Sequence, residues 1–186
     1  MDFNSKSNDN ISRKLDQLIA RQEIHDVMCR YARSVDRRDW VTLRTCFHDD
    51  ASDQHGEFTG NADAFIEWVS NRHATVPFSM HLLANCLIEF RDAATALVET
   101  YFVAMQRREK PSGTTGLQPA GVDMEVFGRY CDKFERRAGI WRIASRRVVY
   151  DSTRTQPSSN HLRELVGVLG RRDQDDPVYA MNGTTD

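Results

Sequence analysis

Apolar residues near the start of the chain recur at the spacing of one helix face. From Ile24 to Val35, the residues at helical spacing are all apolar or aromatic. They are Ile24, Val27, Met28, Tyr31, Ala32 and Val35. The next position on this face is Asp36. Because a buried, unpaired carboxylate costs several kcal/mol, comparable to the whole stability margin of a domain, we predict a hydrogen-bond partner for Asp36.

The same helical spacing predicts three helices in the first part of the chain. The first covers residues 11–35, either as one long helix or as two joined near residues 20–21, and the polar residues 1–10 before it are expected to be disordered. Asp39 is a suitable N-cap for a second helix that reaches Phe47. A polar segment with a turn and a short strand leads to the third helix, over residues 61–73.

After Pro77 the pattern changes to the alternation that is typical of strands. It predicts a meander of four antiparallel strands over residues 80–92, 94–108, 122–137 and 140–151, with tight turns at Asp92-Ala93 and Ala138-Gly139. The fold class is therefore α+β, a curved antiparallel sheet whose concave face is covered by the three N-terminal helices. We expect one domain over residues 11–155 and a tail over residues 156–186, with a short helix near residues 161–170.

Composition narrows the function classes. The 186 residues carry a net charge of −2, with 25 basic and 27 acidic side chains mixed along the chain, which argues against nucleic-acid or membrane-surface binding. No apolar run reaches the ~20 residues of a membrane span, and the polar N-terminus does not resemble a signal peptide. Four well-separated cysteines without a C-x-x-C motif suggest reduced thiols in a cytoplasmic protein and no zinc site.

His81 is the histidine best placed to be the partner of Asp36, because it lies in the first long strand. Strand alternation places polar and apolar residues together on its face, whereas the opposite face is apolar. The residues on the His81 face are His81, Leu83, Asn85, Leu87 and Glu89. Such scattered polar groups are typical of a ligand cavity. The other histidines are expected to be solvent-facing, in loops, at a helix end or in the tail, at positions His25, His48, His55, His73 and His161.

A histidine–aspartate pair has a specific chemistry. The carboxylate fixes the imidazole tautomer and stabilises the imidazolium, so the other ring nitrogen can act as a general base near neutral pH. The hydroxyl of Tyr31 could polarise a carbonyl. Spacing alone leaves structural interpretations open: His81 as a satisfied strand residue, Asp36 bonded at a helix end to Arg37 or Arg38, and Tyr31 as a core aromatic.

Longer motifs add a family resemblance over roughly residues 12–151. The string RYARSVDRRDWVTLRTCFHDDA, the strand FSMHLLANCLIEF and the hairpin YCDKFERRAGIW together resemble the SnoaL-like part of the nuclear-transport-factor-2-like superfamily, which has a cone-shaped α+β fold. Within it the chain is similar to scytalone dehydratase, bile-acid 7α-dehydratase and lindane dehydrochlorinase. The resemblance implies elimination of water or HCl by a His–Asp dyad without metal or organic cofactor.

Residue by residue, the resemblance implies that His81 is the base and Asp36 its orienting carboxylate. Tyr31 matches a tyrosine of the bile-acid enzyme, and Arg146 is a weaker match to an arginine of the dehydrochlorinase. Asp53 stands where the bile-acid enzyme has a second active-site tyrosine, so the substrate should differ. Candidate pocket walls, each of which could also be plain core, are Phe47, Asp53, Phe65, Trp68, Asn85, Phe102, Met105, Phe127 and Val149.

The leading hypothesis is a cofactor-independent, dehydratase-like lyase for a hydrophobic cyclic or aromatic substrate that carries a hydroxyl group. One alternative is a non-catalytic small-ligand binder or a subunit like the small subunits of aromatic-ring dioxygenases, which belong to the same superfamily. Another is an isomerase or polyketide cyclase, which would use the same base without a leaving group. A homotrimer or homodimer formed through the outer sheet face is also expected from the resemblance.

Overall fold

The computed structural model describes residues 3–109, 121–158 and 167–181, and within them one six-stranded sheet has the order β2-β1-β6-β5-β4-β3. The elements are α1 (Phe3–Arg37), α2 (Trp40–Thr45), β1 (Phe47–His55), β2 (Phe58–Asn61), α3 (Ala62–His73), β3 (Phe78–Phe90), β4 (Thr95–Glu109), β5 (Gly121–Arg137), β6 (Ile140–Pro157) and α4 (Pro177–Ala180).

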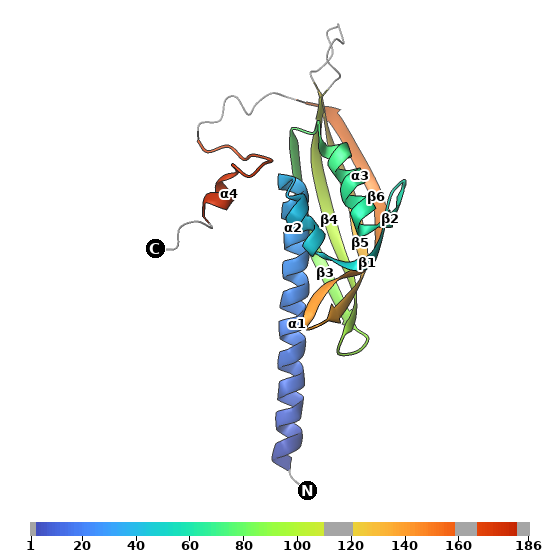
Figure 1. Ribbon diagram of the computed structural model, residues 1–186, viewed down its shortest axis with the longest axis vertical. Helices are drawn as coiled ribbons and strands as arrows, with labels where there is room; N and C mark the ends of the chain where they lie inside the picture. The colour runs from blue at the N-terminus through green and yellow to red at the C-terminus, as the bar shows by residue number, and fades with distance from the viewer. Residues whose placement is uncertain (1–2, 110–120, 159–166, 182–186) are drawn as a thin grey trace.

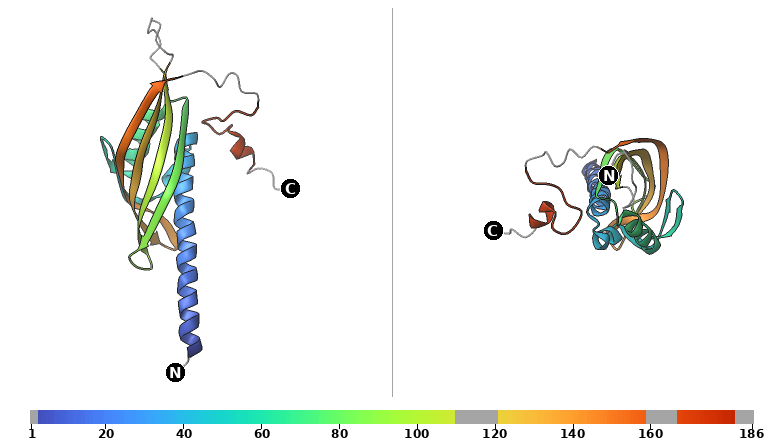
Figure 2. Two further views of the ribbon diagram at one scale, coloured as in Figure 1. Left: turned by 180° about the vertical axis from the view of Figure 1, so that it is seen from behind. Right: turned by 90° about the horizontal axis from the view of Figure 1, so that it is seen from above.

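The sheet curls into a trough, and the N-terminal helices close its open side (Figure 1; Figure 2, right). The predicted face of α1 is buried in the trough from Ile24 to Val35, and it packs with aromatic side chains such as Phe65 and Phe134. The α+β class and the curved sheet under three N-terminal helices are thus confirmed. None of the described helices is long and apolar enough to span a membrane.

Two predictions about the N-terminal half were wrong. Helix α1 begins at Phe3 rather than at residue 11, because no glycine or proline interrupts the chain before Gly56, and its first half extends beyond the sheet (Figure 1). The second helix ends at Thr45, and the polar segment after it forms the two strands β1 and β2. Since β1 pairs with β6 in parallel, the sheet is not wholly antiparallel.

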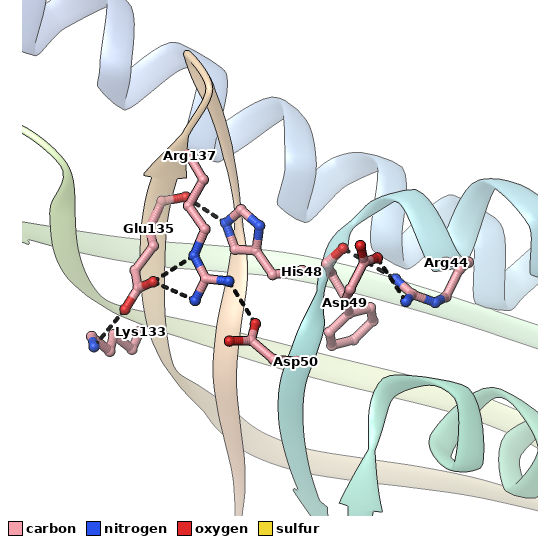
Figure 3. Close-up of polar contacts among 8 residues, drawn as sticks. Arg44, His48, Asp49, Asp50, Lys133, Glu135 and Arg137 are labelled. Carbon is pink, nitrogen blue, oxygen red and sulfur yellow. Dashed lines mark hydrogen bonds and ion pairs between the residues drawn. The ribbon is translucent and has the colours of Figure 1, made fainter.

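The β5–β6 hairpin has the predicted tight turn. Ala138 and Gly139 both have positive φ, at 49° and 82°, as a two-residue hairpin turn requires. A polar network ties this hairpin to β1, because the side chain of Arg137 bridges Glu135 and Asp50 (Figure 3). The ring Nε2 of His48 also hydrogen-bonds to the carbonyl oxygen of Glu135, at 2.8 Å.

Strand β3 does not alternate evenly, since its pairing with β4 shifts between Leu83 and Cys86. Such a bulge moves the later side chains to the other face of the sheet. His81 and Leu83 point into the trough, as predicted. Beyond the shift, Cys86, Ile88 and Phe90 are the inner residues, whereas the predicted inner residues Asn85, Leu87 and Glu89 are exposed on the outer face.

The tail returns to the end of α1 (Figure 1; Figure 2, left). Arg37 forms an ion pair with Asp176, and the Tyr179 hydroxyl donates a hydrogen bond to Asp39. The helix predicted near residues 161–170 lies mostly outside the described residues, and its described part, residues 167–170, is not helical. The tail therefore docks on the helix whose last turn carries Asp36.

Candidate active site

Asp36 and His81 form a hydrogen-bonded pair between the last turn of α1 and the start of β3. The distance from His81 Nδ1 to Asp36 Oδ1 is 2.7 Å, and both side chains are largely buried. The backbone N–H of His81 also donates to Asp36 Oδ2, at 2.8 Å. One residue thus holds both oxygens of the carboxylate, so the position of the imidazole relative to α1 is fixed.

A third donor completes the environment of Asp36, because the Ser79 hydroxyl lies 3.0 Å from Oδ1. Burial alone would raise the pKa of Asp36, but the hydrogen bonds and charge of His81 and the Ser79 hydrogen bond outweigh it, so the pKa is lowered. Asp36 is therefore a carboxylate at neutral pH and can stabilise an imidazolium.

His81 opens onto a cavity of about 210 Å³ inside the trough. Its walls come from α1, α3 and five of the strands, with Tyr31, Val35, His55, Trp68, Val69, Arg72, His73, His81, Phe102, Ala104, Gln106, Arg108, Met124, Val126, Tyr130, Tyr150 and Thr153. An apolar and aromatic lining with a few convergent polar groups is typical of small-molecule sites.

Tyr31 lines this cavity from α1 and packs deeply against the core. Its ring stacks on Phe65 at 6.4 Å and meets Phe47 edge-on at 6.0 Å. Burial raises the pKa of the phenol despite the nearby Arg146, so the hydroxyl stays protonated. Phe47 and Phe65, predicted as pocket walls, therefore support Tyr31 from behind instead of lining the cavity.

Arg146 is not among the cavity walls. Its guanidinium forms a two-bond ion pair with Asp132, at 2.7 and 2.8 Å, and neither side chain is exposed. It is also sandwiched between the rings of Tyr31 and Tyr130, at 4.0 and 4.2 Å from their centroids. The structure thus places Arg146 next to Tyr31 and away from the cavity surface.

Asp53 is buried at the end of the same cluster, but it does not line the cavity. Neither of its oxygens has a hydrogen-bond partner among the described residues, and the nearest ring nitrogen, His55 Nδ1, is 3.7 Å away. Burial raises its pKa to about 7, against the opposing effect of Arg146. Asp53 instead borders an open depression of about 590 Å³ that spreads over the outer face of the sheet.

The remaining predicted pocket residues divide into two groups. Trp68 and Phe102 line the cavity, as expected. Four others do not, because alternation and the β3 bulge turn their side chains to the opposite face of the sheet from their cavity-lining neighbours: Asn85, Met105, Phe127 and Val149. The prediction that these four form pocket walls was wrong.

Sequence reasoning missed two histidines of the cavity. His55 was expected in a polar loop, but it ends β1 with its ring packed on Phe65 and Trp68, at 5.3 and 5.5 Å. His73 was expected to be a cation at a helix end, but it is buried. Burial, reinforced by nearby positive charge, lowers the pKa of both rings to about 3, so both are neutral.

Arg172, in the tail, was also missed. Its guanidinium donates hydrogen bonds to the backbone carbonyls of Val35 and Asp36, at 3.0 and 2.8 Å, and to that of Val76. It also lies 2.8 Å from Nδ1 of His73, whose other nitrogen contacts the cavity residue Gln106. The tail therefore caps the helix end that presents Asp36, which no local sequence pattern indicates.

Comparisons with known proteins identify the family of the chain. The model of the SnoaL-like domain matches residues 16–147. The chain belongs to the SnoaL-like family. A search of curated protein sequences gave no match for this SnoaL-like protein.

Solved structures of similar fold include two from Novosphingobium. A provisionally assigned scytalone dehydratase from Novosphingobium aromaticivorans has a TM-score of 0.65 at 19% identity and covers 78% of this chain and 92% of that chain. The type-3 hexachlorocyclohexane dehydrochlorinase of Novosphingobium barchaimii has a TM-score of 0.67 at 19% identity, with coverage of 78% and 96%.

A protein of unknown function from Mycobacterium tuberculosis covers 90% of this chain and 86% of that chain, with a TM-score of 0.58 at 22% identity. These TM-scores show that this SnoaL-like protein shares their fold. Within the described residues, no group of three histidine, cysteine or acidic side chains is arranged to hold a metal ion.

Proposed function

We propose that this SnoaL-like protein is a cofactor-independent lyase of the dehydratase type, with His81 as its general base. The observation that carries the proposal is the 2.7 Å hydrogen bond between His81 Nδ1 and Asp36 Oδ1 at the wall of a cavity. Because Asp36 is ionised, the proton of the neutral imidazole sits on Nδ1 and the lone pair is on Nε2. This is the tautomer that a general base needs.

In the proposed reaction, His81 Nε2 takes a proton from the carbon next to a carbonyl group. The electron pair of that C–H bond forms the new carbon–carbon double bond, and the hydroxyl on the next carbon leaves. The imidazolium, stabilised by Asp36, returns its proton to the leaving hydroxide, so one water molecule is released and the enzyme is restored. Tyr31, protonated at every working pH, donates a hydrogen bond to the carbonyl oxygen, where negative charge develops.

Arg146 has a supporting role in this proposal. It pairs with Asp132, is packed on the Tyr31 ring and does not line the cavity, so it holds Tyr31 in place and does not itself touch the substrate. His55, neutral and lining the cavity, is a further hydrogen-bond group available to the substrate.

The cavity volume limits the substrate. A cavity of about 150 Å³ is known to admit benzene, so the 210 Å³ here suits one or two fused rings and is too small to enclose a steroid nucleus. The aromatic walls from Trp68, Phe102 and Tyr130 favour a flat ring. The proposed substrate is therefore a small cyclic ketone with a hydroxyl group on the β carbon.

The test is a thermal-shift screen of such β-hydroxy ketones, followed by the rise in ultraviolet absorbance that accompanies formation of the conjugated enone. We expect turnover by the wild type and a loss of about 10²- to 10⁴-fold in His81→Ala. Unchanged turnover in His81→Ala would refute the mechanism. An isomerised product without loss of water would instead indicate that the same base serves an isomerase.

We also propose that the outer face of β3 belongs to a homotrimer or homodimer interface, because Met80, Leu82 and Leu87 are exposed there. Sedimentation equilibrium should then show an oligomer that Leu82→Glu dissociates. A monomeric wild type would contradict this proposal and leave the cavity chemistry untouched.

A further inference from the structure

We propose that the cavity takes an anionic ligand, whose carboxylate or similar oxyanion is held at the mouth by Arg72 and Arg108. In naming the substrate class this inference rests on the proposed lyase function, but the binding itself can be tested separately. The ligand would place its ring inside the cavity, against the aromatic walls, and its negative group between the two arginines.

The two arginines come from different elements and converge on one opening. Arg72 lies in the last turn of α3 and Arg108 lies near the end of β4, and both line the cavity. They also line an adjoining pocket of about 270 Å³, together with Gln106 and Thr75. The opening therefore offers two guanidinium groups, an amide and a hydroxyl, which are the groups that bind carboxylates and phosphates.

The cavity wall has no negative charge to neutralise these arginines. Three histidines and two arginines line it, and no aspartate or glutamate does. Neither Arg72 nor Arg108 has a carboxylate partner among the described residues. The neighbouring Arg107 shows the contrast, because it pairs with Asp123 on the other face of β4 at 2.7 Å.

The electrostatic effects of this excess of positive charge are visible on several groups. Burial and then the charge of Arg72 lower the pKa of Arg108, as is expected for two guanidinium groups at one opening. Arg72 also helps to lower the pKa of His55 and of His73, although burial and the charges of other basic groups have larger effects. An anion at the mouth would relieve all these repulsions at once.

Arg72 is also held in position for such a role. Its guanidinium lies over the Trp68 ring, 5.4 Å from the centroid, and Trp68 is itself a cavity wall. A cation stacked on an aromatic ring keeps its N–H donors free around its edge. The anion site is therefore joined to the apolar site through one side chain, which suits a ligand that is both aromatic and negatively charged.

The experiment compares 2-naphthoate with its neutral amide, 2-naphthamide, by isothermal titration calorimetry on the full chain. We expect the wild type to bind the acid more tightly than the amide. Arg72→Gln and Arg108→Gln should each weaken binding of the acid about tenfold, the loss of one charge-assisted hydrogen bond, and leave binding of the amide nearly unchanged. The double variant should bind the two compounds equally.

Arg91→Gln is the matched control, since Arg91 follows the last residue of β3, at the far end of the strand from His81, and pairs with the exposed Glu89. It should bind both compounds like the wild type. The inference is overturned if the wild type does not bind the acid or binds the amide equally well. It is also overturned if Arg91→Gln weakens binding of the acid as much as Arg72→Gln and Arg108→Gln do.

The outcome is separable from that of the proposed reaction. His81→Phe removes the base and leaves both arginines in place, so it should still prefer the acid over the amide. If that preference depends on the two arginines while no elimination activity is found, the anion site stands and the lyase proposal falls. If elimination is found but the arginine variants bind the acid normally, the anion site falls and the lyase stands.

Discussion

Asp36 and Asp53 are two buried aspartates in one small domain, and their surroundings are opposite. Asp36 accepts hydrogen bonds from the Ser79 hydroxyl and from the backbone and ring of His81. Asp53 has no hydrogen-bond partner for either oxygen among the described residues. The pKa is accordingly lowered in Asp36 and raised to about 7 in Asp53.

The difference teaches that burial alone does not decide what a carboxyl group does. Where donors are built around it, the group stays ionised and can hold an imidazolium, as at Asp36. Where donors are lacking, the group keeps its proton and becomes a neutral part of the core, as at Asp53 below neutral pH. Asp36 therefore suits catalysis, whereas Asp53 changes charge near the working pH without facing the cavity.

The largest expected effect separates the two aspartates in catalysis. Asp36→Asn removes the negative charge that stabilises the imidazolium, and turnover of a substrate found by the screen should fall about 10²- to 10⁴-fold. Asp53→Asn changes a carboxyl group that does not line the cavity and whose pKa is about 7, and it should change turnover by less than about threefold near pH 7. Equal losses of turnover in the two variants would contradict a catalytic role that is specific to Asp36.

The next effect concerns the ion pair beside Asp53. Arg146→Met leaves Asp132 buried without its partner, so the free energy of unfolding should fall by about 3–5 kcal/mol in urea denaturation. The double variant Arg146→Met with Asp132→Leu removes both charges and should recover most of that loss. If the double variant is as unstable as the single one, the loss does not come from an unpaired buried charge, and the two side chains stabilise the fold through other contacts.

The pH dependence of stability should have opposite signs for the two aspartates. The folded pKa of Asp53 is above the ordinary 3.8, so the folded state binds the extra proton between about pH 4 and 7. Its contribution to stability is full below pH 4 and is lost as the pH rises through 7, by up to about 4 kcal/mol. The folded pKa of Asp36 is lowered, so its contribution is full above pH 4 and is lost on acidification.

Urea denaturation of Asp53→Asn and Asp36→Asn from about pH 2 to 8 measures both signs. Relative to the wild type, Asp53→Asn should gain stability as the pH rises from about 4 to 7. Asp36→Asn should lose relative stability as the pH rises to about 4 and should show no further relative change above it. Parallel curves for wild type and Asp53→Asn would mean that Asp53 titrates normally.

The smallest effect tests the support of Asp36 by the tail. Arg172→Gln removes charged donors from the carbonyls of Val35 and Asp36 and should lower the free energy of unfolding by about 1–3 kcal/mol. Arg171→Gln is the control, because Arg171 is exposed and its side chain bonds, among the described residues, only to Asp173 and Asp175. Equal effects in the two variants would contradict a specific role for Arg172.

Local patterns predicted much of this molecule. The helical spacing of α1 identified Asp36 as out of place, and its partner proved to be His81, because both residues precede any irregularity in their elements. Alternation also held along β5, where Tyr130 and Asp132 are both buried. A carboxylate on that buried face, Asp132, could have predicted a buried cationic partner, which the structure shows to be Arg146.

The misses have physical causes that act over long distances. The bulge in β3 follows from its pairing with β4, and it moved Asn85 out of the cavity. His55 and His73 become cavity residues only because β1 and α3 pack together over the trough. Arg172 reaches Asp36 across most of the chain length, which hydrophobic periodicity does not report.

The most direct test of the central claim is hydrogen–deuterium exchange of a ketone probe at the carbon next to its carbonyl. 2-Tetralone in deuterated buffer can be followed by proton NMR with catalytic amounts of the protein, and it needs neither a leaving group nor a negative charge. The account predicts accelerated exchange by the wild type and a loss of at least about 100-fold in His81→Ala and in Asp36→Asn. Exchange by the wild type that is no faster than in buffer, or that His81→Ala retains, would contradict the assignment of His81 as the base.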